Sequence, residues 1–412
     1  MKIGFYIHYT MLKAGGIFTY SIGILRLLLK ADEIEKIVII TTPEVKGALS
    51  EIANNNKVKF SLLDRESFSN KARLFLSFFL YDTFVIYQHY FPKSKKLEKL
   101  SSISNFINPY QRIIKNSGIS LLQVPIQYSP IYKTSVPVVT TMHDVQEFHF
   151  PEFFTASERL HRAINNLKSV SESDHIIVSF DHIKKDLLKY YSVPAEKISV
   201  CPPPFADDWF ATKKETDWQI LEKKYSITQK YLLYPAATWP HKNHLTLVEA
   251  LSEVKKTIPE ISLVCTGNKT EYYSTIEKKL KELKQENSVK FLGIVPEEDL
   301  IGLYKNAELV VIPTLYEAGS GPLYEAMKYK VPVICANTTS LPETVSNAKY
   351  VFNPSDVNEL SVLIIKMLSD EDEKGENVNN SEKRMKELGQ KNYFKSFKDV
   401  YFFLIKYSKA VR

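Results

Sequence analysis

The chain has 412 residues, of which 44% are hydrophobic and 25% charged, and its formal net charge is +7. This composition is typical of a folded globular protein and excludes extensive disorder, and the length favours two domains of about 200 residues each. The charge excess is too small to indicate nucleic-acid binding, which needs a dense basic stripe. An anionic ligand or an anionic membrane surface suits it better.

Cys201, Cys265 and Cys335 are odd in number and far apart, so we expect core residues in a reducing compartment rather than disulfides or zinc ligands. The N-terminal stretch is more like a first strand than a signal peptide. Residues 74–87 form the most apolar stretch, which is too short to span a bilayer and contains Asp82. We therefore expect a cytoplasmic protein, with peripheral contact at the cytoplasmic membrane face left open.

The first half of the chain alternates short apolar runs with helix-like segments. Since the runs lack polar alternation, they are typical of parallel strands that helices bury on both faces. The expected strands are residues 2–7, 36–42, 58–63, 119–124, 137–143, 174–180 and 197–202. We therefore predict one doubly wound α/β domain over residues 1–205.

Residues 66–115 interrupt this alternation. They are rich in Phe and Tyr and contain the basic stretch PKSKKLEK at residues 92–99. We expect a helical insertion that packs on its own domain, and an acceptor-binding or membrane-facing surface is the alternative.

A Pro-rich turn and a polar segment, residues 203–229, form the expected hinge. Apolar runs then return at residues 231–236, 261–267, 289–295, 308–314, 331–336 and 349–354. A second doubly wound domain is therefore expected over residues 206–390. Residues 391–412 are predicted to form a basic amphipathic helix that docks on its own protein.

A strand, a turn and a helix follow one another in the stretch Val310–Ile334. We expect the helix to start at Pro322, since proline lacks the amide hydrogen that the first helical position leaves unpaired. Gly319, Ser320 and Gly321 lie in the turn, where small residues, backbone amides and a helix N-terminus can hold an anion. Because ligands of parallel sheets sit beyond the carboxyl ends of the strands, we predict a phosphate-bearing ligand here.

Two glutamates, Glu317 and Glu325, flank this turn, eight positions apart. Glu325 would be the fourth helical residue and has no capping role there, so both carboxylates can accept hydrogen bonds from sugar or ribose hydroxyls. The pattern resembles the E-x7-E signature of family 4 glycosyltransferases, usually E-G-F-G-L-P-x-x-E-A-M. This chain shares Glu317, Pro322, Glu325, Ala326 and Met327 with it, and its glycines are shifted by one position. By this resemblance Glu317 holds the transferred sugar and Glu325 the ribose.

A second stretch, Tyr234–Leu251, resembles the mannosyltransferase-type variant of the same family, with Lys242 at the start of a helix. The resemblance implies that Lys242 neutralises the departing nucleotide diphosphate. Many relatives carry an arginine five residues earlier, where this chain has Ala237. Either His241, Asn243 or another domain supplies that hydrogen-bond donor, or the stabilisation of the leaving group is weaker.

Three further stretches carry the resemblance. Residues 138–154 are similar to a loop of the family's first domain, which implies that His143 contacts the transferred sugar. Gly15 and Gly16 occupy a turn that would face the donor phosphates, and residues 289–300 match a segment that meets the nucleotide base. The remaining donor-binding residues that the resemblance implies are Thr238, Gly267, Ile294, Val295 and Leu323.

Together these matches imply the GT-B fold, with two doubly wound parallel-sheet domains facing a cleft and the C-terminal helix crossing back to the N-terminal domain. They also imply a retaining transfer of a hexose from a nucleotide-diphospho-sugar, with GDP-mannose favoured over a UDP- or dTDP-sugar. The acceptor would be a saccharide or lipid-linked saccharide of cell-envelope polysaccharide synthesis, at the inner membrane surface. No cofactor or metal is expected, since the Asp-x-Asp at residues 370–372 lies in an acidic tail segment.

Two alternatives to a transferase stay open. A nucleotide-sugar 2-epimerase uses the same fold and would change the sugar without any acceptor. An inactive GT-B protein would bind nucleotide or polysaccharide and hold an assembly together.

Overall fold

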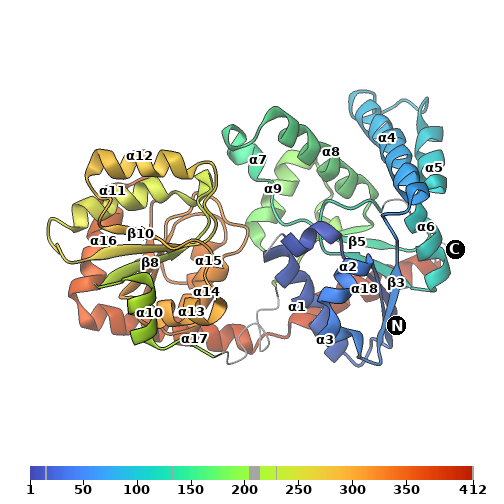
Figure 1. The fold of residues 1–412 in the computed structure, drawn as a ribbon. Helices are drawn as coiled ribbons and strands as arrows, with labels where there is room; N and C mark the ends of the chain where they lie inside the picture. The colour runs from blue at the N-terminus through green and yellow to red at the C-terminus, as the bar shows by residue number, and fades with distance from the viewer. Residues whose placement is uncertain (14–15, 132–133, 204–213, 229, 411–412) are drawn as a thin grey trace. The chain divides into compact units, whose positions relative to one another are not determined.

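The computed structural model describes residues 1–13, 16–131, 134–203, 214–228 and 230–410, and it divides the chain into two compact units. Unit 1 comprises Met1–Pro204 and Asn392–Arg412, and unit 2 comprises Phe205–Lys391 (Figure 1). The boundaries expected from the sequence, after residues 205 and 390, lie one residue from these.

Unit 1 is built on a parallel sheet. Its described residues form seven strands in the order β3-β2-β1-β4-β5-β6-β7. The strands are β1 Lys2–Tyr6, β2 Lys36–Thr41, β3 Val58–Leu62, β4 Leu121–Val124, β5 Val138–Thr141, β6 His175–Val178 and β7 Ile198–Val200. β4, β5 and β6 are buried along their whole length, as the lack of polar alternation predicted. The strand order reverses between β1 and β4, and the loops that follow such a pair of strands leave room for a ligand.

The helices of unit 1 include the C-terminal one. They are η1 Tyr9–Lys13, α1 Gly16–Lys30, α2 Pro43–Ala48, α3 Ser50–Ala53, α4 Phe68–Tyr90, α5 Glu98–Ile107, α6 Pro109–Ser117, α7 Gln146–His149, η2 Pro151–Phe153, α8 Ala156–Glu172, α9 Asp181–Tyr191, η3 Ala195–Lys197 and α18 Tyr393–Ala410. α18 contacts α1, β4 and β7. Its Tyr401 hydroxyl donates a hydrogen bond to Gln123 Oε1 at 2.8 Å. The last helix therefore belongs to unit 1, as the predicted fold requires.

Unit 2 repeats this plan. Its described residues form six parallel strands in the order β10-β9-β8-β11-β12-β13. The strands are β8 Tyr231–Pro235, β9 Ser262–Thr266, β10 Val289–Phe291, β11 Leu309–Ile312, β12 Val333–Ala336 and β13 Val351–Phe352. The order reverses between β8 and β11, which pair directly in the sheet. The loops after β8 and β11 are therefore neighbours, and they carry Lys242 and Glu317.

Helices cover both faces of the second sheet. They are α10 Trp218–Tyr225, η4 Pro240–Lys242, α11 His244–Val254, α12 Tyr273–Leu283, α13 Glu297–Lys305, α14 Gly321–Lys328, α15 Leu341–Val345, η5 Ala348–Tyr350, α16 Val357–Ser369 and α17 Glu371–Gly389. Figure 1 shows α11 and α12 on one face and α13, α14 and α17 on the other.

The expected hinge was too long at its C-terminal end. Residues 218–225 form α10, whose Leu221 lies in the hydrophobic core of unit 2. Three side chains of this segment, Thr216, Lys224 and Tyr225, donate hydrogen bonds to the buried carboxylate of Asp299 at 2.5 to 2.6 Å. The polar composition of the segment made it look like a linker, whereas it contains a helix whose side chains bind the Asp299 carboxylate of α13.

Each apolar run predicted from the sequence contains one strand, so the predicted fold class of two parallel-sheet, doubly wound domains is confirmed. Cys201, Cys265 and Cys335 are buried and form no disulfide, as expected of core residues. Within the described ranges, no helix is long and apolar enough to cross a membrane.

Candidate functional site

Two of the residues implicated in catalysis meet at the carboxyl edge of the second sheet. Lys242 Nζ lies 2.6 Å from Glu317 Oε2, and their side chains are only 19% and 13% exposed. The two residues come from different loops, one after β8 and one after β11. The structure therefore places an ammonium and a carboxylate together at the reversal point of the sheet, where ligands of such folds bind.

Three hydrogen bonds fix the backbone around Lys242. The buried Tyr234 hydroxyl donates to the Lys242 carbonyl at 2.8 Å. The Leu315 amide and the Thr314 hydroxyl both donate to the His241 carbonyl, at 2.8 and 2.9 Å. These bonds join the two loops, so the position of Lys242 relative to Glu317 is set by the backbone as well as by the ion pair.

Asn243 anchors the same loop through its side chain. Its Nδ2 donates to the carbonyls of Pro313 at 2.9 Å and Pro354 at 2.8 Å, while its Oδ1 accepts from the Thr246 hydroxyl at 2.9 Å. The residue is buried and its φ is +57°, in the left-handed region that asparagine tolerates better than most residues. Both amide hydrogens are thus used within the protein. Asn243 positions Lys242 and does not stand in for the arginine missing at Ala237.

The loop that carries Glu317 is tied to the segment after β12. The Glu317 amide donates to Thr339 Oγ1 at 3.1 Å, and the Thr339 hydroxyl donates to the Glu317 carbonyl at 2.7 Å. The Ser340 hydroxyl donates to the same carbonyl at 3.2 Å. Gly319 follows, half-buried, before the helix begins. The Glu317 backbone is therefore held on the side opposite Lys242's loop.

The helix after this loop starts one residue earlier than expected. α14 begins at Gly321, and Pro322 is its second residue. The buried Ser320 caps the helix, because its hydroxyl accepts from the Leu323 amide at 3.4 Å. The expectation placed Pro322 first because proline suits that position. The serine cap moves the start forward, and it uses the Ser320 hydroxyl inside the protein.

Glu325 is consequently the fifth residue of α14 rather than the fourth. Its Oε2 accepts a hydrogen bond from the Tyr304 hydroxyl at 2.7 Å. Burial, with the adjacent Glu325 carboxylate, raises the pKa of Tyr304 well above 10, so this phenol stays a donor at neutral pH. The Tyr304 bond orients the half-buried Glu325 carboxylate.

The ends of β8 and β9 approach each other closely at Gly267. This glycine has φ +109°, and a Cβ there would lie 2.7 Å from the Ala236 carbonyl carbon and the Ala237 amide nitrogen. Thr238 is buried, and its Oγ1 accepts from the Thr270 amide at 2.8 Å. Gly267 and Thr238 therefore shape the backbone beside Lys242's loop.

The two residues assigned to the nucleotide base differ in exposure. The Ile294 side chain is 79% exposed, just beyond the end of β10. Val295 is partly buried and packs against the hydrophobic core of unit 2. Of these two residues, Ile294 therefore has the more accessible side chain.

His244 makes the edge of unit 2 sensitive to acid. The ring is 1% exposed and lies 4.8 Å from the Tyr234 ring and 6.0 Å from the Phe291 ring. Burial, together with nearby Lys242, lowers its pKa from 6.5 to about 3, against the opposing effect of the Ala236 backbone. The folded state thus binds this proton more weakly than the unfolded chain does. The stability that the neutral ring contributes is complete above about pH 6.5 and is lost as the pH falls toward 3.

We expect the His244 ring to lower the unfolding free energy of unit 2 by about 2 kcal/mol when the pH falls from 7 to 5, because the unfolded chain takes up the proton and the folded one does not. The variant His244→Phe keeps an aromatic ring and cannot titrate, so its unfolding free energy should fall by about 2 kcal/mol less over this interval. Denaturant unfolding of the full chain at the two pH values measures the difference. Equal pH dependence in both proteins would contradict the assignment.

His143 follows β5 in unit 1, as predicted. Its Nε2 lies 2.8 Å from the Pro125 carbonyl, which can only accept, so Nε2 carries the hydrogen. Burial lowers the pKa of His143, against the opposing effects of the Pro125 carbonyl and Asp144. The neutral ring therefore keeps Nδ1 unprotonated, as an acceptor. The Tyr20 ring meets it edge-on at 4.8 Å between centroids.

Gln127 was missed by sequence reasoning. It is 2% exposed, and its Oε1 accepts from the His143 amide at 2.9 Å while its Nε2 donates to the Asp144 carbonyl at 3.0 Å. The Ser169 hydroxyl in turn donates to the Gln127 carbonyl at 2.8 Å. Gln127 is a positioning residue for His143. The signal was present, since a polar residue stands just beyond the buried strand β4.

Gly16 is the first residue of α1, and a Cβ there would meet nothing within 4 Å. Gly15 lies outside the described residues.

Unit 1 has a pocket at the carboxyl edge of its sheet that the sequence did not reveal. Its volume is about 410 Å³, and Tyr9, Thr42 and Arg65 contribute from the segments after β1, β2 and β3. The Arg65 guanidinium lies 4.0 Å from the centroid of the Tyr9 ring. The other lining residues are Glu44, Glu66, Lys71, Leu74, Phe75 and Phe78. Carboxylates, cations and aromatic rings together are the groups that bind saccharide hydroxyls and ring faces.

The Asp-x-Asp segment has a structural role. Asp370 caps α17, because its Oδ1 accepts from the Glu373 amide at 3.0 Å, and Asp372 lies in the first turn. Acidic residues there complement the helix dipole. In the described part of the chain, no group of three or more His, Cys, Asp or Glu is placed to hold a metal ion.

Comparison with known proteins agrees with this geometry. Residues 217–391 match the family model described as Glycosyl transferases group 1. O-antigen chain mannosyltransferase B of Escherichia coli is 29% identical over 234 residues, which are 57% of this chain and 61% of the relative. O-antigen chain mannosyltransferase RfbU of Salmonella typhimurium is 27% identical over 217 residues, which are 52% of this chain and 56% of the relative. The chain thus spans less than two thirds of the length of the curated relatives it matches.

Two solved structures share the fold across almost the whole chain. HepE of Anabaena, in complex with UDP and glucose, has a TM-score of 0.65 at 16% identity and covers 98% of this chain and 99% of its own. WaaG, a glycosyltransferase involved in lipopolysaccharide biosynthesis, has a TM-score of 0.61 at 14% identity with the same coverage. At such identities the likeness concerns the fold, which is GT-B. Residues 217–391, which are nearly all of unit 2, are thus the part of the chain that is similar to the glycosyl transferases of group 1.

Proposed function

We propose that the chain is a retaining, metal-independent glycosyltransferase that moves a hexose from a nucleotide-diphospho-sugar to a saccharide or lipid-linked saccharide of cell-envelope polysaccharide synthesis. The observation that carries the proposal is the Lys242–Glu317 pair at the reversal point of a group 1 glycosyl transferase unit. Because the ammonium and the carboxylate are adjacent, the ammonium can bind the phosphate of a donor molecule while the carboxylate binds its sugar.

Lys242 and the N-terminus of α14 would carry the charge of the leaving group. When the donor binds, the Lys242 ammonium would exchange its ion pair with Glu317 for one with the diphosphate. The Glu317 carboxylate would then accept hydrogen bonds from sugar hydroxyls. The bond between sugar C1 and the diphosphate oxygen breaks while the acceptor oxygen bonds C1 from the same face. The acceptor proton passes to the departing phosphate oxygen. In unit 1, the Nδ1 acceptor of His143 would receive a hydrogen bond from the transferred sugar.

GDP-mannose is the favoured donor. Two relatives that match more than half of this chain are named mannosyltransferases, which supports mannose. HepE was solved with UDP and glucose, so a UDP-sugar is the second candidate. We assign the ribose to the carboxylate of Glu325, which the Tyr304 hydroxyl orients.

The acceptor saccharide would occupy the pocket of unit 1. Glu44 and Glu66 can accept hydrogen bonds from its hydroxyls, Arg65 can donate, and Phe75 and Phe78 offer ring faces. We place the protein at the cytoplasmic face of the membrane, where a lipid-linked acceptor would be found.

The test is a transfer assay with the purified full chain. Thermal-shift measurements against GDP-, UDP- and dTDP-sugars select the donor, and turnover is then followed with and without saccharide acceptors in the presence of a chelator. We expect hexose transfer with the donor's anomeric configuration, read by nuclear magnetic resonance. Epimerised sugar without any acceptor would identify the 2-epimerase instead, and donor binding without any turnover would identify the inactive scaffold.

A further inference from the structure

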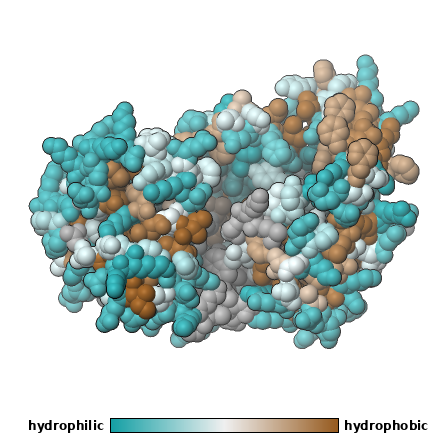
Figure 2. All heavy atoms as spheres, viewed as in Figure 1, coloured by the Kyte–Doolittle hydropathy of each residue, from teal (hydrophilic) through white to brown (hydrophobic). Residues whose placement is uncertain are grey.

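One helix of unit 1 presents an unusual outer face. Phe68, Phe75, Phe79, Ile86 and Tyr90 on α4 are 40% to 87% exposed. Their spacings of seven and four residues place them on one side of a helix. The turn after α4 adds Phe91, and α5 adds two more exposed side chains, Ile103 and Phe106. Figure 2 shows the apolar colour gathered over α4 and α5.

This outer face, which we define as the stripe of α4 with Phe91 and the exposed residues of α5, is large for a surface that only meets water. Of the twenty large apolar side chains that are exposed among the described residues, nine lie between residues 68 and 106. Scattered exposed apolar residues need no explanation, but a contiguous group marks a binding surface.

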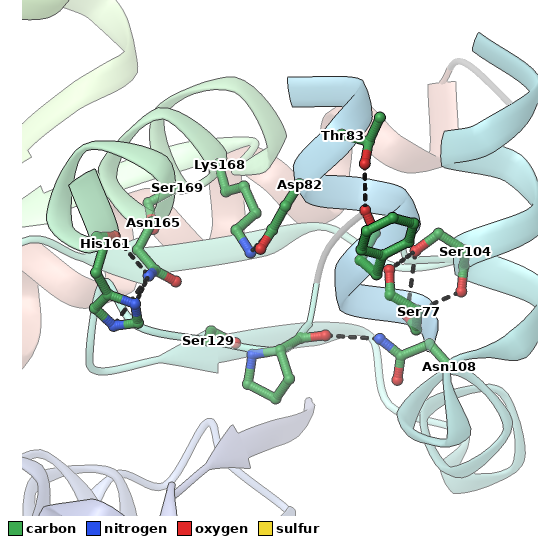
Figure 3. A network of polar contacts seen from close by, with 12 residues as sticks. Ser77, Asp82, Thr83, Ser104, Asn108, Ser129, His161, Asn165, Lys168 and Ser169 are labelled. Atoms are coloured by element: carbon green, nitrogen blue, oxygen red, sulfur yellow. Dashed lines mark hydrogen bonds and ion pairs between the residues drawn. The ribbon is translucent and has the colours of Figure 1, made fainter. Parts of the chain in front are cut away.

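The opposite side of α4 is fixed to the rest of unit 1, so the outer face cannot turn inward. Ser77 and Ser104 are buried, and the Ser104 hydroxyl donates to the Ser77 carbonyl at 2.7 Å, which joins α4 to α5. At the margin of the outer face, Asp82 of α4, three residues after Phe79, forms an ion pair with Lys168 of α8 at 2.7 Å. Figure 3 shows Ser77 facing Ser104 on one side of α4 and Asp82 reaching toward Lys168 on another.

The polar group on the stripe is satisfied by the helix itself. Thr83 lies four residues after Phe79 on the same side, and its hydroxyl donates to the Phe79 carbonyl at 2.7 Å (Figure 3). The acidic residue of α4 is Asp82, whose carboxylate is engaged by Lys168. The Thr83 hydroxyl and the Asp82 carboxylate therefore keep their partners when this part of the outer face leaves water.

Positive charge flanks this apolar face. Lys93, Lys95, Lys96 and Lys99 are exposed in the turn and first residues of α5, against the single acid Glu98. Each lysine near an anionic membrane surface contributes about 1 kcal/mol of attraction. Exposed aromatic rings beside lysines are the composition of helices that lie in a membrane interface.

We propose that the outer face of α4 and α5 docks unit 1 on the surface of an anionic lipid bilayer. Since no described helix can cross a membrane, the hairpin lies along the surface. Phe75 belongs both to the stripe and to the saccharide pocket, so a lipid-linked acceptor could keep its chain in the bilayer and its sugar in the pocket. The inference rests on the proposed function only for the identity of that acceptor.

Vesicle flotation of the full chain tests the surface. We expect the wild type to bind vesicles of phosphatidylcholine with about one third phosphatidylglycerol, to bind phosphatidylcholine alone at least tenfold more weakly, and to be released by salt. The triple variant Phe68→Ser, Phe79→Ser, Tyr90→Ser should lose at least tenfold in binding to the anionic vesicles. It changes only exposed side chains outside the pocket, so its melting temperature should stay near that of the wild type.

A matched control is Ile220→Ser with Val362→Ser, which removes two exposed apolar side chains from unit 2 and should leave vesicle binding unchanged. Equal binding by the triple variant and the wild type, or no binding by the wild type, would overturn the proposal. So would a lipid-free dimer, seen by sedimentation velocity, that the triple variant abolishes.

Donor binding separates this inference from the proposed function. If the triple variant no longer binds vesicles but nucleotide-sugar still raises its melting temperature as in the wild type, the surface is a membrane contact and the donor site is independent of it. If the wild type binds vesicles but no nucleotide-sugar, the proposed function fails and the membrane surface stands.

Discussion

Replacement of Lys242 by alanine is expected to lower hexose transfer by about 100- to 1,000-fold, the usual effect of removing one charged or hydrogen-bonding group from a developing anion. The ammonium lies 2.6 Å from Glu317 Oε2 and is 19% exposed, so little water is present to replace it. Single-turnover transfer measured at saturating donor reports the loss in the chemical step.

The alanine variant also leaves the Glu317 carboxylate without its partner, and a control must remove that effect. The double variant Lys242→Ala, Glu317→Gln has no stranded charge, so its melting temperature should recover relative to the single variant. Its transfer rate should not recover, because neither change restores a cation at the diphosphate. Lys242→Arg keeps the charge and should retain a measurable part of the rate.

If the Lys242→Ala variant transfers hexose at a rate within about twofold of the wild type, Lys242 does not stabilise the leaving group. Transfer that recovers fully in the double variant would show that the loss came from the unpaired carboxylate. Either result would show that Lys242 has a structural role and does not stabilise the leaving group.

Asn243→Ala is expected to destabilise unit 2 by about 3 to 4 kcal/mol and to lower transfer as well. Alanine at φ +57° costs about 1 to 2 kcal/mol, and the carbonyls of Pro313 and Pro354 each lose a buried hydrogen bond worth about 1 kcal/mol. Denaturant unfolding of the full chain measures the free energy, and the same samples give the transfer rate.

Asn243→Gly separates the two contributions. Glycine adopts the left-handed conformation without strain, so it should lose only the side-chain bonds, about 2 kcal/mol. In both variants the loop of Lys242 is less firmly held, and transfer should fall together with stability. A variant that loses stability and keeps full transfer would show that the Asn243 anchor does not position Lys242.

The central strands could be predicted from the sequence because they are buried on both faces. Runs such as residues 309–312 are wholly apolar, and burial of a whole strand leaves that record in the residues themselves. α10 could not be predicted in this way. Its core contact depends on Leu221, while its polar face is held by Asp299, which is far away in the chain.

The start of α14 shows how two local rules compete. Proline at the first helical position favoured Pro322, but the Ser320 hydroxyl is able to cap the helix and begins it at Gly321. Both preferences are present in the sequence. The choice between them was made by the Ser320 conformation in the folded loop, in which the hydroxyl accepts from the Leu323 amide.

The sequence by itself determined the two doubly wound sheets. It also singled out Lys242, Glu317 and His143 after the carboxyl ends of strands, and Glu325 in the helix that follows Glu317. Only the tertiary structure decided how these residues are held: Lys242 against Glu317, Glu325 against Tyr304, and His143 by Gln127. It also decided that the aromatic face of α4 points outward, since Ser104 holds the opposite side of the helix at Ser77. The physical reason is that the burial of a strand is recorded in the residues of that strand. An ion pair or a side-chain hydrogen bond instead joins residues that are far apart in the chain and that only the order of the strands brings together.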